Sequence, residues 1–213
     1  MTAGGSAAAR AAALRAGARR GWWRRVLAWL GWSRGVRRAD GVAARWELGA
    51  AAEAETARAL AALVARGWHV RHDLALPGSR ANLDHVLVAP DGTVVVLDTK
   101  RWHRAYPTRL VGGRVCCGTQ DRHGQVEAVV RYAARVAGAL GLPAGSVWPL
   151  LVVHGSPVAG GYLTVPVAGC AVPVYVLGAE RLLSTLASAR LVPDRRRAAA
   201  VAARVDEVLR PYA

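Results

Sequence analysis

A β-hairpin is predicted for residues 82–100, which run NLDHVLVAPDGTVVVLDTK. Apolar and β-branched residues dominate both halves of this segment, as is typical of buried strands. Between the halves, Ala89-Pro90-Asp91-Gly92 is a strong turn signal. The pattern therefore predicts strands over Leu83–Val88 and Thr93–Asp98, joined by a tight turn.

This hairpin carries three charged side chains on one predicted face. Side chains alternate along a strand, so Asp84 shares its face with Val86, and Asp98 shares its face with Lys100. The tight turn places residue 84 opposite residue 97 or 98. Adjacent carboxylates repel each other, and a divalent cation would remove the repulsion because hard oxygen ligands suit Mg²⁺. The alternative is a half-buried salt-bridge cluster in which Lys100 pairs with both aspartates.

A helix is predicted over residues 47–66, ended by Gly67. Its inner face carries Ala57, Leu60 and Val64, with Thr56 and Leu63 alongside. One turn earlier this stripe reaches Glu53, and an acid on a buried face needs a partner such as a metal ion or a lysine. Glu55 instead lies with Arg58 on the outer face, where an exposed ion pair is expected.

A second helix is predicted over residues 124–140. Its inner stripe consists of Val129, Tyr132, Val136 and Leu140. Gln125 stands one turn before that stripe, where it would reach a substrate or a metal-bound water, or serve as a hydrogen-bonded core glutamine. His85 falls on the opposite strand face from Asp84 and is interpreted as a hydrogen-bonded structural histidine.

The remaining pattern predicts an α/β fold with a mixed central β-sheet flanked by helices. A small hairpin is expected around Gly112-Gly113, within residues 101–118. The other expected elements are strands over Trp68–Leu74, Val147–Val153 and Val172–Leu177 and helices over 179–189 and 194–209.

The net charge of +15 is unevenly distributed over the 213 residues. Residues 1–45 hold ten arginines and one acid, a net of +9, and we interpret them as a basic N-terminal arm that precedes an α/β domain over 46–213. Four tryptophans lie in residues 22–32, which are too short for a membrane span and either contact a bilayer surface or pack on protein. Residues 33–38 are interpreted as a linker. Nucleic acid and anionic lipid would both attract this charge.

The cysteine and lysine contents are also informative. The three cysteines form an odd set without a secretory signal, which predicts a reducing, cytoplasmic location. Lys100 is the single lysine among 29 basic residues, which supports a specific need for an ammonium group at that position.

Together these residues resemble the nuclease-related domain (NERD) family of the PD-(D/E)xK nuclease superfamily, over about residues 47 to 178. The motifs that carry the resemblance are Gly49-x-x-x-Glu53, Ala81-Asn82-Leu83-Asp84-His85, Val96-Leu97-Asp98-Thr99-Lys100 and Gln125. One departure is Ala52, where the family usually has glycine. The resemblance implies a restriction-endonuclease-like core, with Asp84 and Asp98 as metal ligands, Lys100 as the catalytic lysine, and the family's helix acid and glutamine at Glu53 and Gln125.

We therefore expect Mg²⁺-dependent, or Mn²⁺-dependent, hydrolysis of nucleic-acid phosphodiesters, with DNA as the favoured substrate. The expected metal ligands are Asp84, Asp98, Glu53 and the carbonyl oxygen of Thr99. Arg101, Arg104, Arg109 and Arg114 follow the catalytic strand and are expected to bind the phosphate backbone. The alternative is a non-catalytic adaptor that binds nucleic acid or a membrane surface. Many nucleases of the implied fold act as dimers, so a homodimer is a further expectation.

Overall fold

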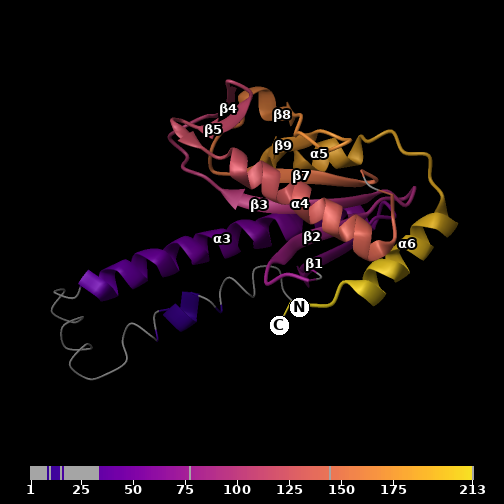
Figure 1. Ribbon diagram of the computed structural model, residues 1–213, viewed down its shortest axis with the longest axis horizontal. Helices are drawn as coiled ribbons and strands as arrows, with labels where there is room; N and C mark the ends of the chain where they lie inside the picture. Colours follow the sequence, from indigo (N-terminus) through magenta and orange to yellow (C-terminus); the bar gives the residue numbers. More distant parts are fainter. Residues whose placement is uncertain are drawn as a thin grey trace.

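The structure, a computed structural model, describes residues 9, 11–14, 16, 34–76, 78–143 and 145–212. The helices named here are α3 (Arg34–Val64), α4 (His123–Leu140), α5 (Leu182–Ala187) and α6 (Arg195–Val208) (Figure 1). The strands are β1 (His69–Ala75), β2 (Asn82–Val88), β3 (Val94–Arg101), β4 (Thr108–Val111), β5 (Arg114–Cys117), β6 (Gln120–Asp121), β7 (Val147–His154), β8 (Tyr162–Val165) and β9 (Val174–Gly178). The tryptophan-rich segment of residues 22–32 lies outside the described residues.

Six strands form one mixed sheet in the order β1-β2-β3-β7-β9-β8. β1, β2 and β3 are antiparallel neighbours, whereas β3, β7 and β9 run parallel and β8 closes the sheet antiparallel to β9. α4 provides the crossover between the parallel strands β3 and β7, as such a connection requires. The predicted mixed α/β sheet with flanking helices is therefore confirmed, and the sheet is consistent with a restriction-endonuclease-like core.

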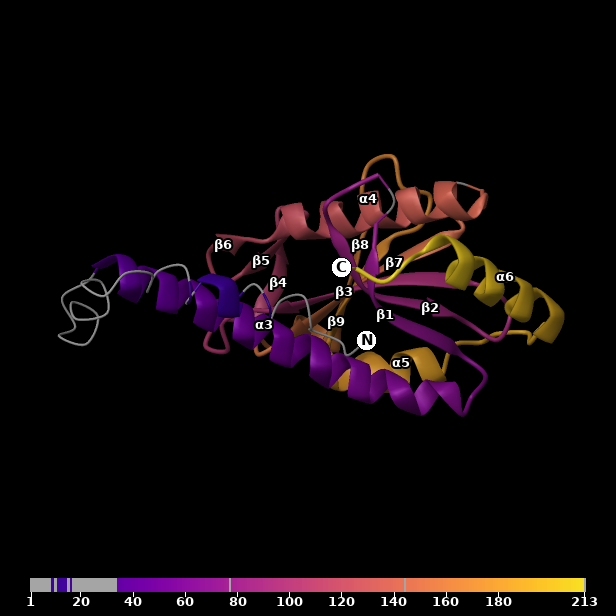
Figure 2. The same ribbon diagram turned by 90° about the horizontal axis from the view of Figure 1, so that it is seen from below.

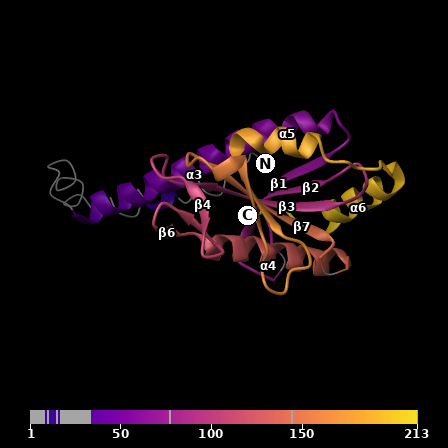
Figure 3. The ribbon, with the colours of Figure 1, turned by 90° about the horizontal axis from the view of Figure 1, so that it is seen from above.

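Helices cover both faces of this sheet and create two separate apolar cores. Figures 2 and 3 show α4 and α6 on one face and α3 and α5 on the other. Val86 and Val96 pack on the first face with residues of α4 and α6, while Leu87 and Leu97 pack on the second with residues of α3 and α5. Because side chains alternate, Asp84 and Asp98 belong to the α4 face and His85 and Thr99 to the α3 face.

The first long helix is longer than its sequence pattern predicts. α3 begins at Arg34 instead of residue 47, so the predicted linker over residues 33–38 is wrong from Arg34 onward. Alanine and arginine favour helix without any stripe of large apolar residues, so a periodicity test finds no signal in this half. At the other end Val64 is exposed rather than part of the buried stripe that Leu60 and Leu63 form.

The C-terminal helix is fastened to the edge strand of the sheet. Arg71 of β1 donates two hydrogen bonds of 2.6 Å to the carboxylate of Asp206, and His69 Nε2 lies 2.9 Å from the same group. The backbone after α6 then pairs with β1 through Ala75 N to Arg210 O at 2.8 Å. The backbone contact covers the C-terminal end of the outer edge of β1, which would otherwise present unpaired backbone groups there.

A second, three-stranded sheet of β4, β5 and β6 follows the end of β3. Val111 pairs with Arg114 around Gly112-Gly113, so the small predicted hairpin is confirmed. The short strands β6 and β8 were not predicted, and the helix expected over 179–189 is a 3-10 turn followed by the six-residue α5. Among the described helices, none combines the length and the apolarity that a membrane span requires.

Candidate active site

Asp84, Asp98 and Lys100 meet where β2 begins and β3 ends. The antiparallel register pairs His85 with Leu97, which leaves the two aspartates on neighbouring strands one residue further along. The Thr99 backbone N–H donates a 2.7 Å hydrogen bond to Asp84 Oδ2. Lys100 Nζ lies 2.6 Å from Asp98 Oδ2 and donates to the Thr99 carbonyl oxygen at 3.2 Å. The structure thus brings together the three charged side chains of the hairpin.

This site is short of positive charge. Both aspartates are buried, and the side chain of Lys100 is 34% exposed. Burial raises the pKa of Asp84 well above its usual value, and the charge of Asp98 raises it further against the opposing effect of Lys100. Burial alone would lower the pKa of Lys100, but the charges of Asp98 and Asp84 outweigh it and raise this pKa. One ammonium group therefore faces two carboxylates, and an additional cation would be stabilised there.

Glu53 of α3 adds a third carboxylate to the same electrostatic environment. It is half-buried, and its charge raises the pKa of both Asp84 and Lys100. α3 itself packs on the face of the sheet opposite to the one that α4 covers. The N-terminal half of α3 extends beyond the sheet at this end (Figure 1).

The oxygen atoms at the site fit a hard divalent cation. Asp84, Asp98 and the Thr99 carbonyl supply oxygen donors, which is the ligand type that Mg²⁺ and Mn²⁺ bind. Within the described residues, no group of three or more His, Cys, Asp or Glu side chains has the geometry of a metal-binding cluster. A cation would therefore depend on the backbone oxygen as well as the aspartates, and it would share Asp98 and that oxygen with Lys100 Nζ.

The comparison with protein families bears directly on these residues. The family model described as nuclease-related domain matches residues 48–154, which include Glu53, Asp84, Asp98 and Lys100. The chain belongs to the nuclease-related domain family. No curated protein and no solved structure matches it. The match ends at the last residue of β7, before the position near residue 178 to which the resemblance was expected to extend.

Gln125 also lies within the matched part of the nuclease-related domain, near the start of α4. Its side chain is half-buried, and its Oε1 accepts a 3.0 Å hydrogen bond from Trp102 Nε1. An indole N–H can only donate, so the amide oxygen is directed to Trp102 and the amide nitrogen is the group left for another partner. For its oxygen, Gln125 is thus the hydrogen-bonded glutamine of the second predicted alternative. Tyr132, which was predicted on the inner stripe of the same helix, is only half-buried.

Behind the carboxylates, Thr99 anchors a buried polar network on the α3 face. Its Oγ1 donates to Thr56 Oγ1 at 3.2 Å, and Thr56 Oγ1 lies 2.8 Å from His154 Nε2. His154 Nδ1 in turn lies 3.1 Å from Glu55 Oε2. Glu55 is exposed, as predicted, but its partner is the buried His154 at the end of β7 rather than an outward-facing residue of its own helix.

The same network continues from Thr99 toward β1 through two histidines. Thr99 Oγ1 lies 3.3 Å from His85 Nε2, and His85 Nδ1 lies 2.7 Å from His72 Nδ1. Burial lowers the pKa of His85 to about 3, and the nearby charge of His72 lowers it as well. His85 is thus a neutral, hydrogen-bonded structural histidine, as its place on the opposite strand face predicted.

The hydrogen-bond directions in this network follow from one fixed end. An ionised carboxylate can only accept, so His154 donates from Nδ1 to Glu55. Burial lowers the pKa of His154 and favours the neutral ring, so its Nε2 accepts from Thr56. Thr56 then accepts from Thr99, whose oxygen accepts in turn from His85 Nε2. The sequence analysis did not predict the role of His154. The one available signal was Thr56, because a hydroxyl on the buried stripe of α3 requires a hydrogen-bond partner.

The four arginines predicted to bind phosphate all lie at this end of the domain and are exposed. Arg101 ends β3, Arg104 is in the following loop, and Arg109 is on β4. Arg114 of β5 differs from them, because its Nε donates to Asp121 Oδ2 at 2.7 Å. Within the described part of the chain, the other three form no salt bridge, which leaves their charge available to a polyanion.

Proposed function

We propose that this nuclease-related domain is a metal-dependent nuclease that hydrolyses phosphodiester bonds in nucleic acid. The observation that carries the proposal is a cluster of two buried carboxylates and one half-buried ammonium group. Asp84 accepts a hydrogen bond from the Thr99 N–H, and Lys100 Nζ lies 2.6 Å from Asp98 Oδ2 and donates to the Thr99 carbonyl oxygen. Burial, and after it the charge of Asp98, raise the pKa of Asp84, and a further cation at the site would oppose both effects by stabilising the ionised carboxylates.

In this proposal Asp84, Asp98, the Thr99 carbonyl and Glu53 hold Mg²⁺ or Mn²⁺. The ion, when bound, polarises the scissile phosphate and lowers the pKa of a water molecule. Lys100 remains protonated, because its pKa is raised, and its ammonium group offsets the negative charge that develops on the phosphate oxygens.

The same proposal assigns binding roles outside the reacting atoms. The Gln125 amide nitrogen orients a water molecule or a substrate oxygen. Arg101, Arg104, Arg109 and Arg114 hold the phosphate backbone without reading its sequence, so binding weakens steeply as salt is added. We further propose that the protein is cytoplasmic and acts on DNA. Two separate proposals are that residues 22–32 contact a membrane surface and that the protein forms a homodimer.

A cleavage assay tests the proposal. Plasmid and single-stranded DNA are incubated with Mg²⁺ or Mn²⁺ and with wild type, Asp98→Asn or Lys100→Ala. Glu207→Gln is the matched control, because it removes one carboxylate from an exposed ion pair on α6, far in sequence from the site. We expect metal-dependent cutting that is lost in both site variants and kept in the control.

One observation favours a second function. Lys100 already bridges Asp98 and the Thr99 carbonyl, as it would in a purely structural salt-bridge cluster. The alternative is therefore a non-catalytic adaptor that binds nucleic acid or a membrane surface with its basic residues. DNA binding that is unchanged in Asp98→Asn, with no cutting under any metal, would support the adaptor and contradict the nuclease.

A further inference from the structure

The loop between β3 and β4, residues 102–107, is held rigidly beside the candidate active site. Trp102 N donates to His154 O at 3.0 Å, and Thr108 N donates to Pro157 O at 2.8 Å. Between these anchors, Ser156 Oγ donates to Tyr106 O at 2.6 Å and lies 2.7 Å from Thr108 Oγ1. The last residue of β7 therefore fixes the start of the loop, and the segment after β7 fixes its end.

This fixed loop presents an aromatic side chain to solvent. Tyr106 is 53% exposed although its backbone oxygen is hydrogen-bonded to Ser156. A Cβ atom added at Gly118, where φ is +59°, would lie 3.0 Å from the Tyr106 Cβ and Cγ atoms, so the small sheet packs closely against the base of this side chain. The base of the side chain is therefore held in place while the rest of the ring remains accessible.

A second exposed ring lies next to the first. The His103 and Tyr106 rings are 5.1 Å apart and tilted by 39°. His103 is also ordered, because its Nδ1 accepts a 3.3 Å hydrogen bond from Ala105 N. Two exposed rings in fixed positions would lose little side-chain entropy on binding a planar ligand.

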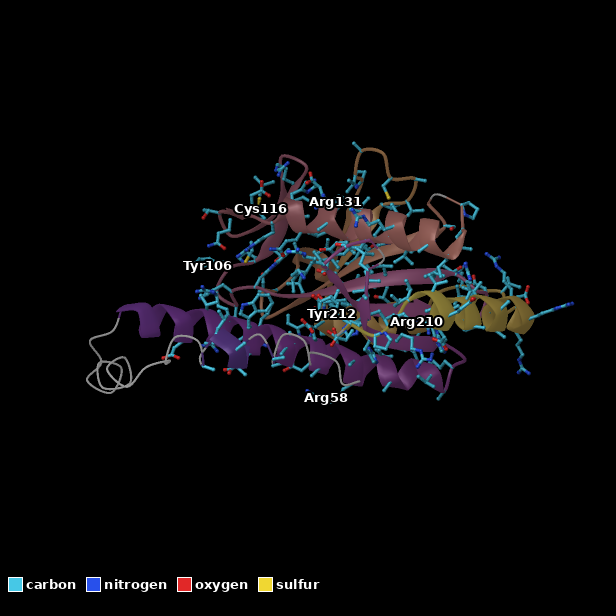
Figure 4. The ribbon with its side chains drawn as sticks, turned by 60° about the horizontal axis from the view of Figure 1, so that its bottom comes forward. Arg58, Tyr106, Cys116, Arg131, Arg210 and Tyr212 are labelled. Carbon is cyan, nitrogen blue, oxygen red and sulfur yellow. The ribbon has the colours of Figure 1, made fainter. Side chains whose placement is uncertain are left out.

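The surroundings of the rings are cationic. Arg104 lies between them in sequence, and Arg101 and Arg109 flank the loop, all three exposed and without a salt bridge to any residue that the structure describes. In Figure 4, Tyr106 lies between the small sheet, marked by Cys116, and α3. Tyr106 is six positions after Lys100 in the sequence, so the two Cα atoms are at most about 22 Å apart.

We propose that His103 and Tyr106 form a stacking platform for an unpaired base, and that the preferred substrate is therefore single-stranded nucleic acid or a strand with unpaired nucleotides. Stacking on aromatic side chains, combined with arginines along the backbone, is how single strands are bound without sequence preference. In a duplex both faces of each internal base are covered by its neighbours, so the platform has no base to bind. This inference rests on the proposed function only in taking nucleic acid as the ligand.

Binding without catalysis provides the test. Fluorescence anisotropy in EDTA measures the affinity of the 213-residue chain for a single-stranded DNA, the matching RNA, and a closed DNA hairpin. We expect Tyr106→Ala to weaken single-strand binding about 5- to 100-fold, the range for loss of one stacked base, and to change hairpin binding less than about twofold. Tyr106→Phe keeps the ring and should bind like wild type.

Tyr162→Ala is the matched control, because Tyr162 of β8 is similarly exposed, at 56%, but lies outside the loop. A 2-aminopurine base in the single strand adds a spectroscopic readout. Its fluorescence should be quenched by wild type and Tyr106→Phe and not by Tyr106→Ala, since quenching reports stacking. Comparison of the affinities for the DNA and for the matching RNA shows which of the two nucleic acids the protein prefers.

Two outcomes would overturn the platform: equal affinity of wild type for single strand and hairpin, or unchanged single-strand binding and quenching in Tyr106→Ala. These results are independent of cleavage. If no metal supports cutting but Tyr106→Ala still loses single-strand binding, the proposed nuclease activity fails and the platform stands. If metal-dependent cutting is observed but Tyr106→Ala binds single strands as wild type does, the nuclease activity stands and the platform fails.

Discussion

Thr56→Val removes a single buried hydroxyl that joins α3 to the back of the candidate active site. Thr56 is 1% exposed, accepts a hydrogen bond from Thr99 Oγ1 at 3.2 Å and lies 2.8 Å from His154 Nε2. Valine has nearly the same volume, so the substitution tests the hydrogen bonds rather than the packing. We expect it to destabilise the protein and to loosen the position of Thr99.

The size of the effect follows from the groups that lose a partner. His154 Nε2 loses its donor inside the protein, and a buried unsatisfied polar group costs roughly 1–3 kcal/mol. Thr99 Oγ1 also loses its acceptor, because His85 Nε2 donates to it and cannot accept its proton, so we expect a loss at the upper end of this range, about 2–3 kcal/mol. For a chain of this length, that lowers Tm by about 4–12 °C.

Urea unfolding of wild type, Thr56→Val and Thr56→Ser measures this loss. Serine keeps the hydroxyl and removes one methyl group, so it should cost only about 1 kcal/mol. A double-mutant cycle with Thr99→Val isolates the coupling between the two hydroxyls, which we expect to exceed about 0.5 kcal/mol. If valine costs no more than serine, or if the cycle shows no coupling, the network does not stabilise this part of the protein.

The buried histidines, the clamp on α6 and the glycines each give a further expectation. The pKa of His85 is lowered from 6.5 to about 3, so below pH 6.5 the unfolded chain binds more protons than the folded chain. The free energy of unfolding, measured in urea, should therefore fall by roughly 2 kcal/mol or more from pH 7 to pH 5. Equal free energies of unfolding at the two pH values would contradict this. The hydrogen bond from Arg71 lowers the pKa of Asp206, so this ion pair stabilises the fold above the pKa of Asp206 in the unfolded chain and no longer does so at lower pH. Asp206→Asn should therefore lower Tm at pH 7 but have little effect near pH 3. The same difference in Tm at both pH values would refute the stabilising role of the ion pair. Gly155→Ala places a Cβ 2.5 Å from Trp102 O at a φ of +85° and should cost about 1–3 kcal/mol. Gly124→Ala meets no atom within 4 Å in α4 and should stabilise by about 0.5–1 kcal/mol, both by thermal unfolding.

The core of the candidate site was predictable because it depends on local rules. Strand alternation and a tight turn over residues 89–92 are enough to place Asp84 beside Asp98, and the observed pairing of His85 with Leu97 has that register. The inner stripe of α3 likewise pointed to Glu53, which is half-buried and whose charge acts on Asp84 and Lys100, while its role as a metal ligand stays a prediction. Each step needed only a period of two or of 3.6 residues.

The rest of the arrangement depends on contacts between distant segments. His154 reaches Thr56 and Glu55 because β7 pairs in parallel with β3, which places residue 154 beside Arg101. No spacing within the sequence encodes that pairing. The N-terminal half of α3 was missed for a different reason, because its alanines and arginines have helix propensity but no buried periodicity.

Thr99 connects the carboxylate site of the hairpin with the buried network that distant segments form. Its backbone N–H and carbonyl bind Asp84 and Lys100 on one side, while its hydroxyl is held among Thr56 and His85 on the other. Because neighbouring side chains on a strand point to opposite faces, fixing Thr99 in the α3 core also fixes the direction of Asp98 and Lys100. The geometry of the site is therefore set from behind, by a residue whose own side chain does not face it. A substitution in the buried network should then alter the carboxylate site without touching any of its charged groups.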